Sequence, residues 1–253
     1  MEPRLRWLAY SAVAVAALAA LVLAASAVGA RLGLWAPRAA IGALRWTALL
    51  AVLGAALSAV ALVLARIGSG SAASSGAGMG AAPVPLLVGA LLVSLAVFAV
   101  PWLVMQRARQ VPFIHDVTTD TADPPAFVAV LPLREGAPNS AVYGGPEVAA
   151  AQAKGYPDLG PRYLAAAPAQ AFEQALAAAR AMGWTIVAAE PAAGRIEATA
   201  TTRWLGFKDD VVVRIRPDAG GSRVDVRSVS RVGKSDLGTN ARRIREYLGR
   251  LGR

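Results

Sequence analysis

Cysteine is absent from the 253-residue sequence, and histidine occurs once, as His115. The lack of cysteine excludes disulfides, thiolate metal sites and cysteine nucleophiles. A single histidine excludes a metal site built on several imidazoles. The sequence also lacks a glycine-rich phosphate loop, a nucleophile elbow and a motif of paired carboxylates. We therefore expect neither a cofactor nor a metal ion.

Asp, Glu, Lys, Arg and His are missing from three long apolar stretches, residues 8–30, 46–65 and 81–106. Each has about 20 residues or more, enough for a helix to span a hydrocarbon core of about 30 Å. Residues 1–106 are therefore predicted to form a three-helix transmembrane region, with a flexible Gly/Ser/Ala-rich connector at 68–83. Four of the six tryptophans lie at the ends of these stretches, where the headgroups are expected: Trp7, Trp35, Trp46 and Trp102. With no charged residue or histidine inside a span, we expect an anchor rather than a transporter.

Two signals disagree on the side of the membrane that holds the rest of the chain. Arg4 and Arg6 precede the first apolar stretch as in an uncleaved signal anchor, which places the C-terminal part outside. A count of arginines by side favours the reverse, because most of them share the side of the C-terminal part: Arg31, Arg38, Arg45, Arg107 and Arg109. We expect a multi-pass protein of the bacterial inner (cytoplasmic) membrane with its soluble part in the periplasm.

From residue 107 onward the chain is polar and basic, with 20 Lys and Arg against 15 Asp and Glu. Residues 107–160 are rich in Pro and Gly and are predicted to form an extended arm. Within it, the apolar run 127–131 suits a short strand. Residues 161–253 are predicted to form an α+β domain.

Hydrophobic periodicity predicts the order of elements in this domain. Helices are predicted at 168–182 and from about Asp236 onward, and strands are predicted at 161–167, 184–189, 195–201, 211–216 and 223–229. This order suits an antiparallel sheet of about five strands with two helices on one face. The other face is expected to be wet, because it carries a set of arginines: Arg195, Arg214, Arg216, Arg223 and Arg227.

The sequence resembles a known family in several phrases. The longest are TTRWLGFKDDVVVRIRP at 201–217 and SVSRVGKSDLGTNARRIREYL at 228–248, and IHDVTTD at 114–120, PPAF at 124–127 and YGG at 143–145 extend the match. Together they resemble the domain-of-unknown-function 1499 family over roughly residues 110–250. The resemblance implies a bacterial envelope or chloroplast protein without an established activity. It supports an outer-side domain and brings no catalytic residues.

One candidate site is the segment that contains His115 and Asp116. An imidazole beside a carboxylate can act as a general base or help to bind a metal ion. The alternative is a structural turn in which Asp and Thr side chains bond to the local backbone.

A second candidate is the ligand-binding loop at residues 203–210, with two aromatic, two basic and two acidic residues: Arg203, Trp204, Phe207, Lys208, Asp209 and Asp210. Exposed aromatic rings flanked by bases suit a flat or lipid-like ligand, or a partner protein. Alternatively, the acidic residues pair with Lys208 and with Arg231.

A third candidate lies near the start of the last helix, where Ser235 or Asp236 suits the N-cap. Free amides there, with Arg231 and Lys234 close by, could receive an anion. A capped helix with a solvated basic face is the alternative.

These features favour a non-enzymatic binding module, held at the membrane, that recognises an anionic ligand, a lipid headgroup or a partner protein. The alternative is a hydrolase-like enzyme in which His115 and Asp116 act beside Ser228, Ser230 or Asp209. Nucleic acid is not expected as a partner of an outer-side domain.

Overall fold

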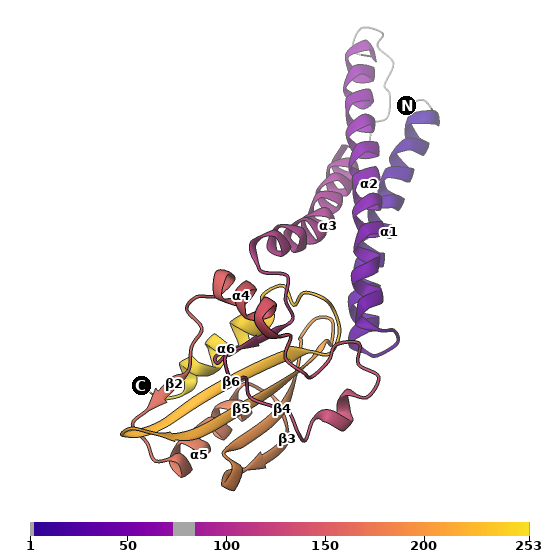
Figure 1. Cartoon of the computed structure of the whole chain (residues 1–253). Helices are drawn as coiled ribbons and strands as arrows, with labels where there is room; N and C mark the ends of the chain where they lie inside the picture. The colour runs from indigo at the N-terminus through magenta and orange to yellow at the C-terminus, as the bar shows by residue number, and fades with distance from the viewer. Residues whose placement is uncertain (1–2, 73–83, 253) are drawn as a thin grey trace. The chain divides into compact units, whose positions relative to one another are not determined.

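The computed structural model describes residues 3–72 and 84–252 and divides into two compact units, Met1–Gln106 and Arg107–Arg253 (Figure 1). The first unit contains three helices, α1 (Pro3–Arg31), α2 (Pro37–Ala72) and α3 (Val84–Gln110), of which α3 continues into the second unit. All three are long and apolar enough to cross a membrane. Helix α2 extends five residues into the predicted connector, and residues 73–83 of that connector lie outside the described residues.

The three membrane helices pack through small residues on α2. A Cβ atom on Gly54 would lie 2.7 Å from the Ser94 hydroxyl of α3 and 3.3 Å from the backbone nitrogen of Ala16 in α1. Ser58 is buried and bonds its own helix, donating to the carbonyl of Gly54 at 2.8 Å. Small residues here allow backbones to approach closely, which explains their density in this span.

The second unit is an α+β domain with a six-stranded antiparallel sheet. Its strands follow the order β1-β6-β5-β4-β3, and β2 also pairs with β6. The strands are β1 (Asp116–Thr118), β2 (Arg162–Leu164), β3 (Thr185–Glu190), β4 (Arg195–Thr201), β5 (Lys208–Asp218) and β6 (Gly221–Ser230). The helices are α4 (Gly145–Gly155), α5 (Pro168–Ala181) and α6 (Thr239–Arg250), with short 3-10 turns η1 (Leu131–Arg134) and η2 (Pro191–Ala193).

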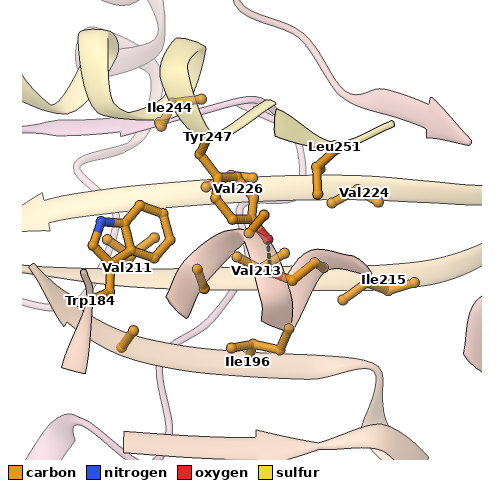
Figure 2. Close-up of a cluster of buried hydrophobic side chains, with 14 of the residues drawn as sticks. Trp184, Ile196, Val211, Val213, Ile215, Val224, Val226, Ile244, Tyr247 and Leu251 are labelled. Carbon is orange, nitrogen blue, oxygen red and sulfur yellow. Dashed lines mark hydrogen bonds between the residues drawn. The ribbon is translucent and has the colours of Figure 1, made fainter. Parts of the chain in front are cut away.

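The main core lies between the sheet and helices α5 and α6, which confirms the predicted fold class (Figure 2). Alternate residues of three strands point into it, among them Ile196, Val213 and Val226. Tyr247 of α6 is fully buried, stacks on Trp184 with ring centroids 4.9 Å apart, and donates its hydroxyl to the carbonyl of Ala175 at 2.8 Å. The alternation in the sequence reports this face correctly because the charged residues of β4, β5 and β6 lie mainly on the opposite side of the strands.

The expectation that the other face is wet is wrong. Residues 119–143 cover it, and we call this segment the covering segment. Phe127 and Val130 of this segment form a second small core with Val212 and Val229. The arginines and acids on this face are paired with each other or with the covering segment, so that Asp225 is fully buried. Charged residues at every second position show that they share one face of a strand. This pattern does not show whether water or another segment of the chain covers that face.

Residues 107–160, predicted as an extended arm, contain β1, η1 and α4. The apolar run at 127–131 is not a strand. The backbone amides of Val128, Ala129 and Val130 all donate to the carboxylate of Glu197, which is fully buried, at 3.0 Å. In a strand, successive amides point in opposite directions, so three in a row cannot share one acceptor.

Candidate functional site at the loop end of the sheet

Three segments that are distant in the sequence meet at one end of the sheet, opposite the β5–β6 hairpin (Figure 1). They are residues 111–115 before β1, the β4–β5 loop at 202–207, and residues 231–238 after β6. The amide of Ser230 donates to the carbonyl of His115 at 3.0 Å, and that of Arg231 donates to the carbonyl of Lys208 at 3.1 Å. We call this place the loop end and the other the hairpin end.

The β4–β5 loop is a closed turn that holds Trp204 away from the domain. Thr202 closes it twice, because its amide donates to the carbonyl of Phe207 and its hydroxyl accepts from the amide of Phe207, both at 2.8 Å. Gly206 supplies the positive φ of +68° that the turn needs. Trp204 is 76% exposed, and the Arg203 guanidinium lies 5.9 Å from its ring centroid. Phe207 is half-buried.

Asp210 is internal rather than available to a ligand. Arg134 lies 2.6 Å from one carboxylate oxygen, and Arg231 bonds both oxygens at 2.9 and 2.8 Å. The hydroxyl of Thr199 donates to Asp210 at 2.8 Å. Burial acts to raise the pKa of Asp210, but these donors hold it below the usual value of 3.8. The pairing with Arg231 agrees with the alternative drawn from the sequence.

Asp209 belongs to a separate buried network beneath the start of α6. Arg243 bridges Asp209 and Asn240, and it also donates to the Ser228 hydroxyl at 2.9 Å. The Asn240 side chain in turn donates to the Ser230 hydroxyl at 3.1 Å. The serines proposed for a hydrolase are thus tied into packing contacts between α6 and the sheet.

Asp116 and His115, adjacent in the sequence, have different environments. Asp116 is buried and forms a two-point ion pair with Arg227 at 2.9 and 2.7 Å. Arg227 is fixed further, because it donates to the carbonyl of Ala141 at 2.8 Å and lies 5.1 Å from the Phe127 ring centroid. His115 is half-buried, and only its carbonyl is bonded among the described residues. The structure does not bring an activated pair together here.

The start of α6 is already occupied by a side chain. Asp236 accepts from the amides of Gly238 and Asn240 at 2.9 and 2.6 Å, so it takes the place that an external anion would need. Burial raises the pKa of Asp236, with Asp209 adding to the effect, although the amide bonds act in the other direction. The prediction that Ser235 or Asp236 takes the N-cap is wrong, because Gly238 holds the N-cap position and α6 begins at Thr239, although Asp236 does bond amides at this end. Lys234 is exposed.

Apart from Phe207, which is half-buried, the predicted ligand-binding residues divide into two sets. Asp209, Asp210 and Arg231 form internal ion pairs. Arg203, Trp204, Lys208 and Lys234 are exposed, and none of the three cations forms an ion pair within the part of the chain that the structure describes. Two further apolar side chains are exposed at the same end, Phe113 at 72% and Leu133 at 52%.

Several residues of these networks are not apparent from sequence reasoning. Arg134 and Arg243 neutralise the two acids of the loop from 76 and 34 residues away, and no local pattern relates them. A third cluster joins Arg214, Arg216 and Arg223 to Asp120, Asp123 and Asp225. The hairpin register contains a signal for it, because Arg216 opposes Arg223 directly and two like charges so placed require acids nearby.

Among residues 3–72 and 84–252, no three or more His, Asp or Glu side chains are grouped so that they could hold a metal ion. A comparison with family models matches residues 116–251 to the family described as protein of unknown function (DUF1499). The chain belongs to the DUF1499 family. The match covers nearly all of the second unit and none of the first, so the DUF1499 domain here is attached to three apolar helices. A search of curated proteins gives no match.

Proposed function

We propose that this protein is a non-enzymatic binding module of the cell envelope, held at the membrane, that recognises an anionic partner through the loop end of its sheet. The observation that supports this is that the acidic and the basic side chains at that end differ in their pairing and exposure. The acids are neutralised internally, whereas Arg203, Lys208 and Lys234 are exposed at the same end of the sheet as Trp204. Such a surface attracts anions without a competing negative field.

A binding role also agrees with the state of the candidate catalytic groups. Asp116 is held by Arg227, Asp209 by Arg243, and the Ser228 hydroxyl by Asn240 and Arg243. A general base needs a lone pair directed at substrate, and a carboxylate bonded at both oxygens inside the protein does not offer one. No observation favours the hydrolase over the binding module.

The first test supplies an anionic surface to the full chain. The protein is placed in nanodiscs of phosphatidylcholine, and binding of added phosphatidylglycerol vesicles is measured at low and high salt. We expect binding that weakens strongly with salt, because the contacts are between exposed charges. The variant Arg203→Gln/Lys208→Gln should weaken it roughly 30-fold, at about 1 kcal/mol per cation.

A matched control removes two positive charges from the hairpin end. Arg162 and Arg250 lie at or near that end, where Arg162 pairs with Val224 of β6 and Arg250 bonds Glu246 on the surface of α6. The variant Arg162→Gln/Arg250→Gln has the same net charge as the test variant and should bind as the unaltered chain does. Binding that stays the same at low and high salt would contradict the proposal.

A further inference from the structure

The point where the chain enters the domain lies at the loop end. Residues 107–110 form the last turn of α3 and belong to the second unit. Arg107 donates from Nε to the carbonyl of Leu237 at 2.8 Å, and a Cβ atom on Gly238 would lie 3.1 Å from the Val111 side chain. Leu237 has a φ of +53°, which is unusual for a residue with a side chain, so this contact is made by a strained turn.

The length of the connection limits how far the loop end can be from the bilayer. Helix α3 has 27 residues, about 40 Å at 1.5 Å per residue, so it extends past a hydrocarbon core of about 30 Å. Its last turn, with Arg107 and Arg109 exposed, therefore belongs at headgroup level. From Gln110, only residues 111–115 intervene before β1, and five extended residues reach at most about 18 Å.

The loop end also has the side chains that membrane interfaces select. Trp204, Phe113 and Leu133 are all more than half exposed there. Exposed tryptophan is favoured at headgroup level, where its ring is partly apolar and its N–H can still bond to water. Three exposed apolar groups among unpaired cations suit an anionic bilayer surface better than they suit water.

Resting on the proposed function, we infer that its anionic partner is the phospholipid surface of the bilayer that the protein itself spans. The loop end docks on the lipid headgroups, with Trp204 at the level of the glycerol backbone and Arg203, Lys208 and Lys234 over lipid phosphates. The hairpin end, with the exposed Asp218, points away from the membrane.

The absence of cysteine allows a direct test, because one introduced cysteine is the only labelling site. Leu205→Cys places a nitroxide beside Trp204 and leaves that residue in place, and Asp218→Cys places one at the hairpin end. Each full-length variant is reconstituted in bilayers of phosphatidylcholine with phosphatidylglycerol. Electron paramagnetic resonance then measures collisions with oxygen, which concentrates in lipid, and with a water-soluble nickel chelate.

We expect the label at position 205 to gain access to oxygen and to lose access to the chelate, while the label at 218 stays accessible to the chelate. Adding Trp204→Ala, or Arg203→Gln/Lys208→Gln, should return the label at 205 to water, with roughly a 5-fold effect per cation. A label at 205 that stays in water, while phosphatidylglycerol vesicles added from outside still bind, overturns this inference and leaves the proposed function standing. A label in water together with no vesicle binding overturns both.

Discussion

At the scale of single residues, the domain is organised by buried carboxylates that each meet several donors. Asp210 and Asp225 are fully buried and each contacts two or more arginines, and Glu197 accepts three backbone amides and lies 3.0 Å from Arg195. Removing one partner from such a group leaves an uncompensated charge in a dry environment, which costs far more than the intact pair contributes. Substitution of these residues should therefore destabilise the domain, because their charges are buried.

Replacing Asp210 by alanine tests this. The variant leaves Arg134 and Arg231 without their carboxylate, and we expect the free energy of unfolding of the second unit to fall by about 3–5 kcal/mol. Amide hydrogen exchange in β5, measured on the full chain in detergent, reports this value. The control is Asp158→Ala, which breaks an exposed pair with Arg245 and should cost about 0–1 kcal/mol. Similar losses in the two variants would show that Asp210 has no special role.

The candidate site was only partly predictable at this scale. The loop at 203–210 was recognised as a unit, but its residues serve two purposes that sequence spacing does not separate. Asp209 and Asp210 are adjacent, so they point to opposite faces of β5 and meet different arginines. Both acids are internal, and the arginine that neutralises each one is brought to it by tertiary packing, Arg134 to Asp210 and Arg243 to Asp209.

At the scale of elements, the covering segment explains why the second face of the sheet is charged. Residues 119–143 lack a long strand or helix of their own, so their backbone and acidic groups are satisfied by side chains from β4, β5 and β6. Arg223 lies 2.6 Å from Asp120, and Glu197 holds the amides before η1. The segment is thus held on the sheet by charge pairs together with a few apolar contacts.

This attachment should depend on pH in a defined direction. Burial acts to raise the pKa of Asp120, yet bonds from local amides and the charges of Arg223 and Arg214 hold it below 3.8. Asp210, which anchors Arg134 of the same segment, has a lowered pKa as well. A carboxyl group with a lowered pKa stabilises the folded state above its unfolded value of about 3.8, and this contribution is lost as the pH falls through the folded value.

We therefore expect the covering segment to loosen only below pH 3.8 or so. The amide of Thr119, which donates to the carbonyl of Val226 at 2.9 Å, is a suitable reporter of hydrogen-exchange protection. Asp120→Asn should reduce protection at neutral pH and flatten its loss in acid. Protection that declines instead as the pH rises toward neutrality would reverse the assigned sign.

The strands and helices of the domain were largely predictable from their apolar faces. The covering segment was not predictable, because it has no such face. Strand β4 was placed at its observed bounds, and β5 and β6 were recognised by their alternating valines, because one uncharged face is a strong signal. The covering segment has no period, since its contacts are with partners distant in the sequence. Its 127–131 run looked like a strand because apolar composition does not reveal where the amides point.

At the scale of the whole molecule, a DUF1499 domain is attached to three helices that can cross a membrane. The sequence contains no Asp, Glu, Lys, Arg or His between positions 8 and 30, 46 and 65, or 81 and 106, which suits anchoring more than transport. Under the proposed function, holding the domain at the bilayer would raise its effective concentration at that surface, so that weak contacts from a few cations and one tryptophan would suffice.

The number of spans and the count of arginines disagree on which side of the membrane holds the domain. One experiment decides between them. With three spans, the domain would lie on the side of the membrane opposite Arg4 and Arg6, and the proposed envelope role makes that side the outside. The arginines next to the domain, including Arg107 and Arg109, argue for the inside. Under the docking inference, the last turn of α3 lies at headgroup level, where arginines suit the interface itself, so the weight of Arg107 and Arg109 in that count falls. We therefore expect that alkaline phosphatase fused after Arg253 in a bacterial host is active, and that green fluorescent protein fused there is dark. Fluorescence without phosphatase activity would place the domain in the cytoplasm, where inner-leaflet lipids and nucleic acid become the anions to test.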